Sequence, residues 1–339
     1  MPLSVAFIRS RSEAILTERG MPEKDAAVLV DSMLAAEICG VATHGIRMLP
    51  AYVQKIDRGD FSFATPSIVK QFAAFTILDA NNTVGAVSAD YAVKIAVEQA
   101  RLHGIHTVLS RNCNTFGAGF YYVEKIAESG MLGLVCCNSP AAMPAFNGLE
   151  AMLGTNPVAF AMPTRSYGSV VVDMATSVVA KSKFAVVRDE GKQLEPGWAL
   201  DQNGNPTTDP DQGIRGLVLP MAGFKGYCIA MMIDIVSGFL SGAGYLNRVG
   251  KFYSMDGGCM NVGQMITAFN PTLLYDGDFI TDADTYVERL KHSKTLEERQ
   301  IIIPGERRRK RREEALKMGL CLTEDVCCEL EKLFGEKLR

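Results

Sequence analysis

Residues 132–173, LGLVCCNSPAAMPAFNGLEAMLGTNPVAFAMPTRSYGSVVVD, decide the fold class of this chain. They contain three short apolar runs of β type, at 132–137, 158–162 and 169–173, separated by loops rich in Gly, Pro and Asn. The loops are too short for the crossover helix that parallel neighbours require. We therefore expect a sheet that is largely antiparallel or mixed.

Helical patterns flank this sheet on both sides. Apolar residues recur at helical spacing near the N-terminus and again from residue 281 to the end, where Thr323 is placed to cap the last helix. The patterns predict helices at 5–19, 22–38, 49–56, 87–102, 118–129 and a buried one at 226–240, with further strands at 75–79, 105–109 and 266–269. We expect an α+β protein with a helical part (1–70), a sheet-containing nucleotide domain (71–275) and a C-terminal helical part (276–339) that packs with the first.

Composition excludes several classes of protein. The chain has 339 residues, of which 47% are hydrophobic and 22% charged, and its net charge is −3. A slightly acidic chain has no general attraction for nucleic acids or acidic membranes. The basic run at 306–314 fits either a nucleic-acid contact or a solvated helix start balanced by acids, and we favour the second. We expect no secretory signal at the N-terminus and no membrane span, because no apolar run reaches roughly 18 residues.

The cysteine pattern indicates free thiols. The nine cysteines include two adjacent pairs but no Cys-x-x-Cys, and no histidine lies at metal-ligand spacing from any of them. We expect a cytoplasmic protein without a metal site.

One of only four histidines lies in a promising setting. His44 falls in GVATHGIR (40–47), between a hydroxyl, a glycine and a guanidinium, just after a helical pattern ends. Imidazole titrates near neutral pH, so such a residue suits proton transfer. A loop histidine bonded to backbone is the alternative. His103, His106 and His292 lie in less promising settings.

The remaining polar groups sit in short loops between apolar segments. No dinucleotide-binding glycine motif, phosphate-binding P-loop or nucleophile elbow is present. Lys225 lies between two glycines just before an apolar helix, where an ammonium and helix N-terminal amides would face the same anion. A surface lysine in a flexible turn is the alternative. The other candidate loops are 112–117, 138–140, 153–157, 173–177 and 304–306.

Taken in order, these motifs resemble the second, non-Rossmann type of malate/L-lactate dehydrogenase family. Members of this family include ureidoglycolate, L-sulfolactate and malate dehydrogenases, diketogulonate reductase and a piperideine-carboxylate reductase. The resemblance covers about residues 10–335, and segment 201–210 looks most like the ureidoglycolate branch. The motifs that carry it are Thr43-His44-Gly45 with Tyr52 and Gly59, LGTNP at 153–157, DMAT at 173–176, and Pro220 with Gly223, Lys225, Gly226 and Tyr227.

The resemblance implies a homodimeric oxidoreductase that uses NAD or NADP to interconvert a 2-hydroxy acid and a 2-oxo acid. Its nucleotide domain would be mainly antiparallel, beside a helical domain formed from both chain ends. His44 would donate or accept the proton. The residues implied for the substrate are Thr43, Arg47, Thr115, Thr155 and Asn156, and those for the cofactor are Ser139, Asp173, Met174, Ala175, Lys225, Pro304, Gly305 and Glu306.

Three positions depart from the family pattern. Met48 stands where the family usually has the arginine that grips the substrate carboxylate, and Arg47 precedes it. Thr115 stands where many members have a histidine, and Ser182 where a glycine is common. These departures leave two alternatives open: a reductase of a cyclic imine or atypical oxo acid on the same fold, or a catalytically degenerate binding protein.

Overall fold

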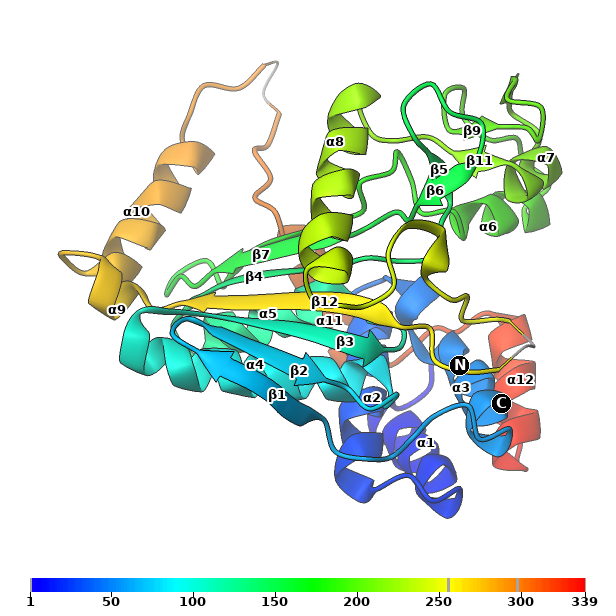
Figure 1. The fold of residues 1–339 in the computed structure, drawn as a ribbon, viewed down its shortest axis with the longest axis horizontal. Coiled ribbons are helices and arrows are strands. Elements are labelled where there is room, and N and C mark those ends of the chain that lie inside the picture. The colour runs from blue at the N-terminus through cyan, green and yellow to red at the C-terminus, as the bar shows by residue number, and fades with distance from the viewer. Residues whose placement is uncertain (1, 255–256, 297–298, 339) are drawn as a thin grey trace.

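A computed structural model describes residues 2–254, 257–296 and 299–338. A seven-stranded sheet crosses the centre of the molecule in the order β1-β2-β3-β12-β4-β7-β8 (Figure 1). Only β2 and β3 run parallel, and the other neighbours are antiparallel, so the predicted mixed sheet is confirmed. The strands are β1 (Ser67–Phe72), β2 (Phe75–Asp79), β3 (Ile105–Cys113), β4 (Leu132–Cys137), β7 (Val158–Met162), β8 (Val170–Met174) and β12 (Val262–Phe269).

Strand β12, the last strand among the described residues, lies between β3 and β4, which are consecutive strands in the sequence. It pairs antiparallel with both, and its Thr267 hydroxyl lies 2.9 Å from that of Thr107 on β3. The expected run at 266–269 is the second half of this strand. Loop length is not what makes β4 and β7 antiparallel, because residues 138–157 between them are long enough for a crossover and hold a small hairpin instead.

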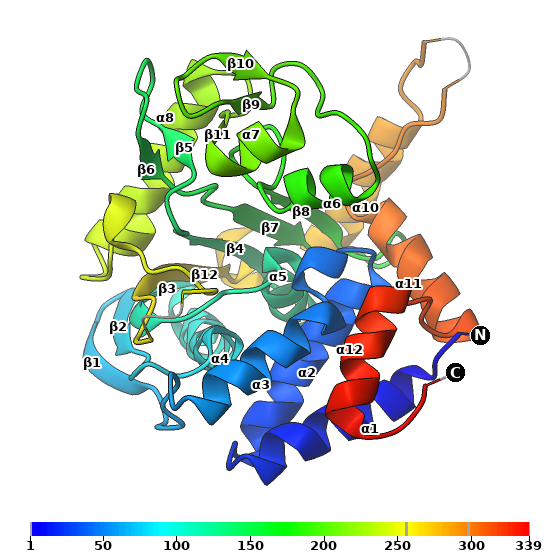
Figure 2. The same cartoon turned by 90° about the vertical axis from the view of Figure 1, so that its right-hand side faces the viewer.

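Two helices cover one face of the sheet. Helix α4 (Gly85–His103) packs on β3 and β12, and α5 (Gly119–Glu128) packs on β4 and β7. Beneath them lies a helical layer built from both chain ends, joined where Leu3 bridges Leu320, and the two termini lie side by side in Figure 2. Its helices are α1 (Val5–Glu18), α2 (Glu23–Ile38), α3 (Leu49–Asp57), α11 (Glu306–Met318) and α12 (Glu324–Phe334).

The C-terminal segment divides between two places. Helices α11 and α12 join the N-terminal helices, whereas α9 (Pro271–Leu274) and α10 (Phe279–Lys291) lie at the opposite end of the sheet (Figure 1). Thr323 is the N-cap residue of α12 but makes no side-chain capping hydrogen bond. The boundaries at residues 70 and 275 stay predictions.

A second lobe with its own hydrophobic core sits above the sheet (Figure 2). Its core includes the fully buried Met143, Phe184 and Val218. Its elements are β5 (Met143–Pro144), β6 (Ala151–Leu153), α6 (Lys183–Asp189), β9 (Ala199–Leu200), β10 (Pro206–Thr207), α7 (Pro210–Arg215), β11 (Leu217–Val218) and α8 (Phe224–Ile233), which continues as a π-helical turn (Asp234–Phe239).

The prediction that 226–240 is a buried helix is wrong in part. This helix buries only a narrow side, formed by Gly226, Ala230, Ile233 and the turn at Ser237. The side chains on its other side are exposed: Phe224, Met231, Met232, Ile235, Phe239 and Leu240. An uninterrupted apolar run predicts burial on all sides, but the single chain covers only one.

Candidate active site

The antiparallel register brings the candidate loops to one end of the sheet. Along that end, Cys113 faces Val262, Cys136 faces Val158, and Val158 faces Met174. Because β3, β4 and β8 end there and β7 begins there, the loops that carry Thr115, Ser139, Thr155, Asn156 and Ala175 start at the same edge. Figure 1 shows β3, β4 and β7, and Figure 2 shows β8 beside β7.

The loop before α8 joins the same edge. Ser177 forms an isolated bridge with Pro220, and the Met221 amide donates to the Thr176 carbonyl at 2.9 Å. These contacts place Lys225, in the first turn of α8, beside the loop that follows β8.

Asn156, which is predicted to lie near the substrate, is fully buried and bonded within the protein. Its Oδ1 accepts from the Ser139 amide at 3.0 Å, and its Nδ2 donates to the Ala230 carbonyl at 2.9 Å. The side chain therefore ties the loop after β4 to helix α8. Gly154 permits this approach, since a Cβ there would lie 2.2 Å from the Ser139 carbonyl oxygen.

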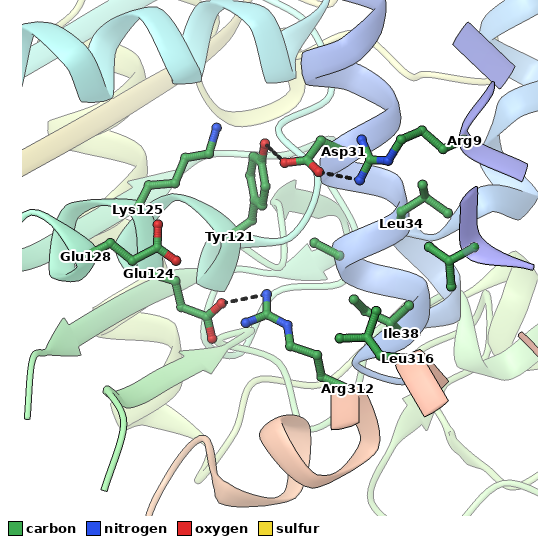
Figure 3. Close-up of a pocket in the computed structure, with 12 residues that line it drawn as sticks. Arg9, Asp31, Leu34, Ile38, Tyr121, Glu124, Lys125, Glu128, Arg312 and Leu316 are labelled. Carbon is green, nitrogen blue, oxygen red and sulfur yellow. Dashed lines mark hydrogen bonds and ion pairs between the residues drawn. The ribbon is translucent and has the colours of Figure 1, made fainter. Parts of the chain in front are cut away.

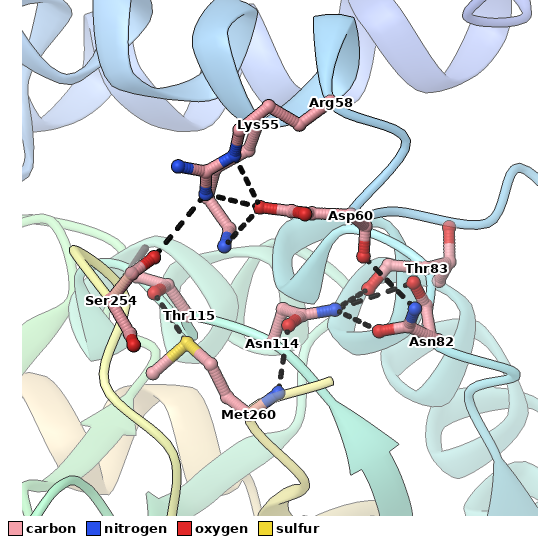
Figure 4. Close-up of polar contacts among 9 residues, drawn as sticks. All are labelled: Lys55, Arg58, Asp60, Asn82, Thr83, Asn114, Thr115, Ser254 and Met260. Atoms are coloured by element: carbon pink, nitrogen blue, oxygen red, sulfur yellow. Dashed lines mark hydrogen bonds and ion pairs between the residues drawn. The ribbon is translucent and has the colours of Figure 1, made fainter. Parts of the chain in front are cut away.

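Two further asparagines act in the same way, and the sequence did not identify them as structural. Asn138 donates to the Gly244 carbonyl and accepts from the Gly263 amide. Asn114 donates to the Thr83 carbonyl and accepts from the Met260 amide (Figure 4). Each directly follows a strand of the sheet, and that position is the only sequence signal that marks them.

Thr115 follows Asn114, and its hydroxyl donates to the Met260 sulfur at 3.3 Å. Figure 4 shows how the surrounding groups link α3 to this loop: Lys55 and Arg58 both bind the Asp60 carboxylate, and the Asn82 side chain donates to the Asp60 carbonyl. The Asn114 side chain then donates to Asn82 in turn. Thr115 thus rests on a bonded framework and keeps only a weak acceptor for its own hydroxyl.

His44 occupies a short 3₁₀ turn (Ala42–His44) directly after α2. Glu37 on α2 holds the turn by accepting from the Ile46 amide at 3.0 Å. Gly45 leaves room for this contact, because a Cβ there would lie 2.0 Å from the Glu37 carboxylate and would displace it. Glu37 was not predicted, although an acid in the last turn of a helix, where basic residues are favoured, is a visible signal.

The His44 imidazole is exposed, and no described residue forms a hydrogen bond with it. The protein surrounding the ring nevertheless desolvates it and lowers its pKa below the usual 6.5. The neutral imidazole is therefore the main form at pH 7. The alternative of a loop histidine bonded to backbone does not match this geometry.

Met48 and Arg47, which follow His44, lie in different environments. Met48 is buried, and its sulfur accepts from the Tyr253 hydroxyl at 3.1 Å. Arg47 is exposed and lies 3.8 Å from the Asp325 carboxylate on α12. The half-buried Thr43 sits in the same turn as His44.

Asp173 belongs to a partly buried ion pair beside the sheet. Its carboxylate accepts from the Phe120 amide at 2.9 Å and lies 3.6 Å from the Arg308 guanidinium. Burial raises the pKa of Asp173, against the opposing effects of these two partners. Its neighbours Met174, which is exposed, and Ala175, which is half-buried, continue toward the shared edge.

The segment Pro304 to Glu306 lies against the middle of β8 rather than at the shared edge. The Pro304 carbonyl accepts from the Val171 amide at 3.0 Å, and Gly305 has φ +99° next to that strand. Glu306 pairs with Lys291. The other residues predicted to bind the cofactor lie at or near the shared edge, whereas this segment does not.

The basic run is not simply a solvated helix start, as the sequence analysis favoured. Besides its pair with Asp173, Arg308 donates to the Val171 carbonyl at 2.7 Å. One turn later, Arg312 lies 3.1 Å from Glu124 on α5. Part of the run therefore fastens α11 to the sheet and to α5.

Lys225 and its surroundings suit an anionic cofactor. Lys225 is exposed, and no described residue pairs with it. The N-cap residue of α8 is Gly223, at φ +61°, so no side chain caps the first amides of this ten-residue helix. Ser182 is also exposed and has φ −60°, so its backbone does not require the glycine common in the family.

A pocket of about 180 Å³ lies away from these groups, between α1, α2, α5 and α11 (Figure 3). Asp31 there accepts from Arg9 and from the Tyr121 hydroxyl, and Arg312 binds Glu124. Most of its charges are paired, and none of the predicted site residues lines it. Within the described ranges, no cluster of His, Cys, Asp or Glu could hold a metal ion, and no helix is long and apolar enough to cross a membrane.

Known proteins are similar to this chain over almost its whole length. The malate/L-lactate dehydrogenase family profile matches residues 3–331. A malate/(S)-sulfolactate dehydrogenase of Methanothermus fervidus is 31% identical over 98% of this chain and 94% of its own. An NAD⁺-dependent ureidoglycolate dehydrogenase of Escherichia coli O157:H7 is 30% identical over 90% and 85%. These two identities are too close to select the ureidoglycolate branch.

Solved structures of related proteins superpose on nearly all of this chain. The sulfolactate dehydrogenase of Methanocaldococcus jannaschii superposes with a TM-score of 0.92 at 29% identity, covering 100% of this chain and 98% of that one. A Δ1-piperideine-2-carboxylate reductase from Pseudomonas syringae gives 0.89 at 25% identity, with both chains fully covered. This chain belongs to the malate/L-lactate dehydrogenase family.

Proposed function

We propose that this protein is an NAD(P)-dependent oxidoreductase that interconverts a 2-hydroxy acid and a 2-oxo acid, with His44 as the proton carrier. The observation that carries the proposal is the exposed His44 imidazole, which is held by Glu37 through its turn and bonded to no described residue. The relatives named above include dehydrogenases of malate, sulfolactate and ureidoglycolate.

The lowered pKa of His44 suits both directions of the reaction. In oxidation, the neutral ring accepts the hydroxyl proton while hydride leaves the same carbon. In reduction, the protonated ring donates to the carbonyl oxygen, and its low pKa makes it a stronger acid. The nicotinamide cofactor supplies or takes up the hydride.

The cofactor would lie along the shared sheet edge. Lys225 and the first turn of α8, which no side chain caps, together favour a diphosphate, because ammonium and helix amides both attract anions. Ser139, whose amide is fixed by Asn156, and the loop from Asp173 to Ala175 would contact the rest of the cofactor. NADP⁺- and NAD⁺-dependent enzymes both occur among the relatives, so either cofactor is a candidate.

Two measurements test the proposal. Titration of NADH and NADPH, followed by nucleotide fluorescence, is expected to saturate with at least one of them. A panel of 2-hydroxy acids and 2-oxo acids, followed by absorbance at the nicotinamide band, is expected to reveal turnover. Cofactor binding without turnover of any substrate would favour a degenerate binding protein instead.

Reduction of a cyclic imine is a second candidate function. Met48 in place of the family arginine favours it, as does the structural likeness to the piperideine-carboxylate reductase. Cyclic imino acids belong in the same panel. Faster turnover of these than of every 2-oxo acid would replace the first proposal.

We also infer a homodimer in the cytoplasm. The exposed apolar side of α8, from Phe224 to Leu240, is a continuous stripe that a second copy of the chain would cover. Light scattering should give twice the chain mass, and Met232→Glu should give a monomer. All nine cysteines are free, as expected in a reducing compartment.

A further inference from the structure

Arg47 lies on the same short segment as the proposed proton carrier. Two consecutive 3₁₀ turns place it three residues after His44. The backbone of this segment is held by Glu37, which accepts from the Ile46 amide at 3.0 Å. The long Arg47 side chain is 40% exposed, so it can turn in solvent on this held backbone. Its guanidinium can therefore change partners without moving His44.

The partner of Arg47 on α12 holds it only weakly. Arg47 Nη2 lies 3.8 Å from Asp325 Oδ2, which is too long for a hydrogen bond, and the Asp325 side chain is 69% exposed. Among the described residues, no other group forms an ion pair or a hydrogen bond with Arg47. Exposed ion pairs of this kind contribute little to stability, since water and salt screen both charges. A ligand carboxylate can therefore displace Asp325 from the guanidinium.

Asp325 is placed by a helix that packs firmly on the protein. It lies in the first turn of α12, whose apolar side is buried, and α12 runs beside α3 (Figure 2). Hydrogen bonding by the Thr323 side chain, together with the Val326 amide and the charge of Arg47, holds the pKa of Asp325 below its usual value. Asp325 is therefore ionised at neutral pH, and its negative charge stays close to Arg47.

The other cations of this region are less suited to bind a carboxylate. Lys55 and Arg58, farther along the chain, share the buried Asp60 carboxylate. Lys251 is exposed, and no described residue pairs with it. An ammonium binds as a point charge, however, whereas a guanidinium binds a carboxylate through two parallel hydrogen bonds. Arg47 is therefore the favoured partner for a substrate carboxylate, and Lys251 is the alternative.

We propose that Asp325 weakens binding of the acid substrate by competing with the substrate carboxylate for the Arg47 guanidinium. Substrate binding then includes the cost of separating Arg47 from Asp325. Asp325 is a positioning residue that acts through Arg47, and α12 carries an autoinhibitory charge beside the segment of His44. This inference rests on the proposed function.

The first test removes the competing charge. Asp325→Asn should lower KM for a 2-oxo acid that the wild type turns over by about two- to fivefold, the factor that an exposed ion pair contributes. The values of kcat and of the cofactor Kd should stay within about 1.5-fold, because neither involves the competition. Glu324→Gln, the neighbouring exposed acid in the same helical turn, is the matched control and should leave KM unchanged. An unchanged or raised KM in Asp325→Asn, with the melting temperature of wild type, overturns the inference.

The second test is a double-mutant cycle. Arg47→Gln should raise KM at least about tenfold, as loss of a charged bidentate contact predicts. In the Arg47→Gln background, Asp325→Asn should have no further effect on KM, because the competition needs the guanidinium. An equal fall in KM in both backgrounds would mean that Asp325 repels the anionic substrate directly, and the proposed exchange would be wrong.

Lys251→Met measures the alternative cation. We expect KM within about twofold of wild type, because the ammonium of Lys251 is not the carboxylate partner. A rise in KM larger than the one that Arg47→Gln produces would assign the carboxylate to Lys251 and overturn the role of Arg47.

A binding measurement separates this inference from the proposed function. Oxamate, a 2-oxo acid analogue that hydride does not reduce, is titrated into each enzyme with saturating NADH or NADPH, followed by nucleotide fluorescence. Asp325→Asn should lower the oxamate Kd by the same factor as KM. An oxamate Kd that Asp325→Asn does not lower contradicts the role of Asp325. Wild-type enzyme that binds cofactor but turns over no acid in the panel contradicts the proposed function instead.

Discussion

At the end of the sheet, Asn114, Asn138 and Asn156 bury their amides and bond them to backbone, whereas the His44 imidazole is exposed and has no hydrogen-bond partner among the described residues. Both kinds of side chain lie in polar loop motifs of similar appearance. The asparagine amides use their hydrogen-bonding groups within the fold. The His44 imidazole keeps its own available for a ligand.

The difference separates residues that build the site from residues that react in it. A buried amide that loses a partner destabilises the protein, because the group left behind stays desolvated. An exposed imidazole bonded to nothing adds little to stability and is free to exchange a proton. Substitutions should therefore affect stability in one group and turnover in the other.

The largest effect is expected from His44→Gln. Removal of a general acid–base group typically costs about 10²–10⁴-fold in kcat. Because no described residue bonds to the ring, the melting temperature should stay within about 1 °C of wild type. Initial rates and differential scanning calorimetry measure both quantities.

His292→Gln is the matched control, because this exposed residue lies at the end of α10, and it should leave kcat unchanged. A His44→Gln enzyme with full turnover on a confirmed substrate removes the proton-carrier role. A large loss of stability would place His44 with the structural residues.

Asn156→Ala should show the opposite pattern. It leaves the Ser139 amide without its acceptor and removes one of the two donors to the Ala230 carbonyl, which still accepts from the Asp234 amide. The expected cost is about 1–3 kcal/mol in the free energy of unfolding. Urea denaturation measures the change. Asn203→Ala, at an exposed turn, should cost less than about 0.5 kcal/mol. Unchanged stability with a raised substrate KM would make Asn156 a ligand after all.

The sequence predicted the positions of helices and strands better than it predicted what packs around them. Apolar runs and turn residues located most strands of the central sheet, yet β1 was missed because all six of its residues are exposed and show no alternation. The central position of β12 depends on pairings between residues more than 120 positions apart, such as Gln264 with Cys137. No local pattern carries that information.

The same limit applies to the residues around the candidate site. The LGTNP motif marked Asn156 as important but not which way its amide points. In the basic run, Arg308 and Arg312 look like their neighbours in sequence, and only the fold brings Asp173 and Glu124 to them. Likewise, a run of apolar residues does not reveal that α8 is covered on one side only.

The Asp173–Arg308 pair lies between the two kinds of residue and should show an intermediate effect. Arg308→Met removes a partner from a carboxylate whose side chain is only 16% exposed, so we expect a loss of about 1–3 kcal/mol. Arg307→Met, one position away and exposed, is the control. Urea denaturation and the cofactor Kd are both measured.

Asp173→Asn completes this test. If Asp173 contacts the cofactor, Asp173→Asn should weaken cofactor binding more than Arg308→Met does. If both variants weaken it equally, or neither does, Asp173 acts only through the ion pair, and the cofactor contacts of this loop belong to Met174 and Ala175.

The smallest expected effect is a displacement of the pH profile. Because the pKa of His44 lies below 6.5, the neutral ring persists to lower pH than a free imidazole would. For oxidation, kcat/KM should rise with pH to a plateau, with the midpoint of the rise below pH 6.5. For reduction, it should fall with rising pH across the same interval, since the protonated ring is the donor.

Both profiles are measured with the same substrate pair in buffers of constant ionic strength. Each curve should show an apparent pKa below 6.5 if His44 carries the proton in both directions. His44→Gln should flatten this limb in each. A limb that survives in the variant, or an apparent pKa above 6.5 in wild type, would mean that a group other than the desolvated His44 imidazole titrates in the reaction.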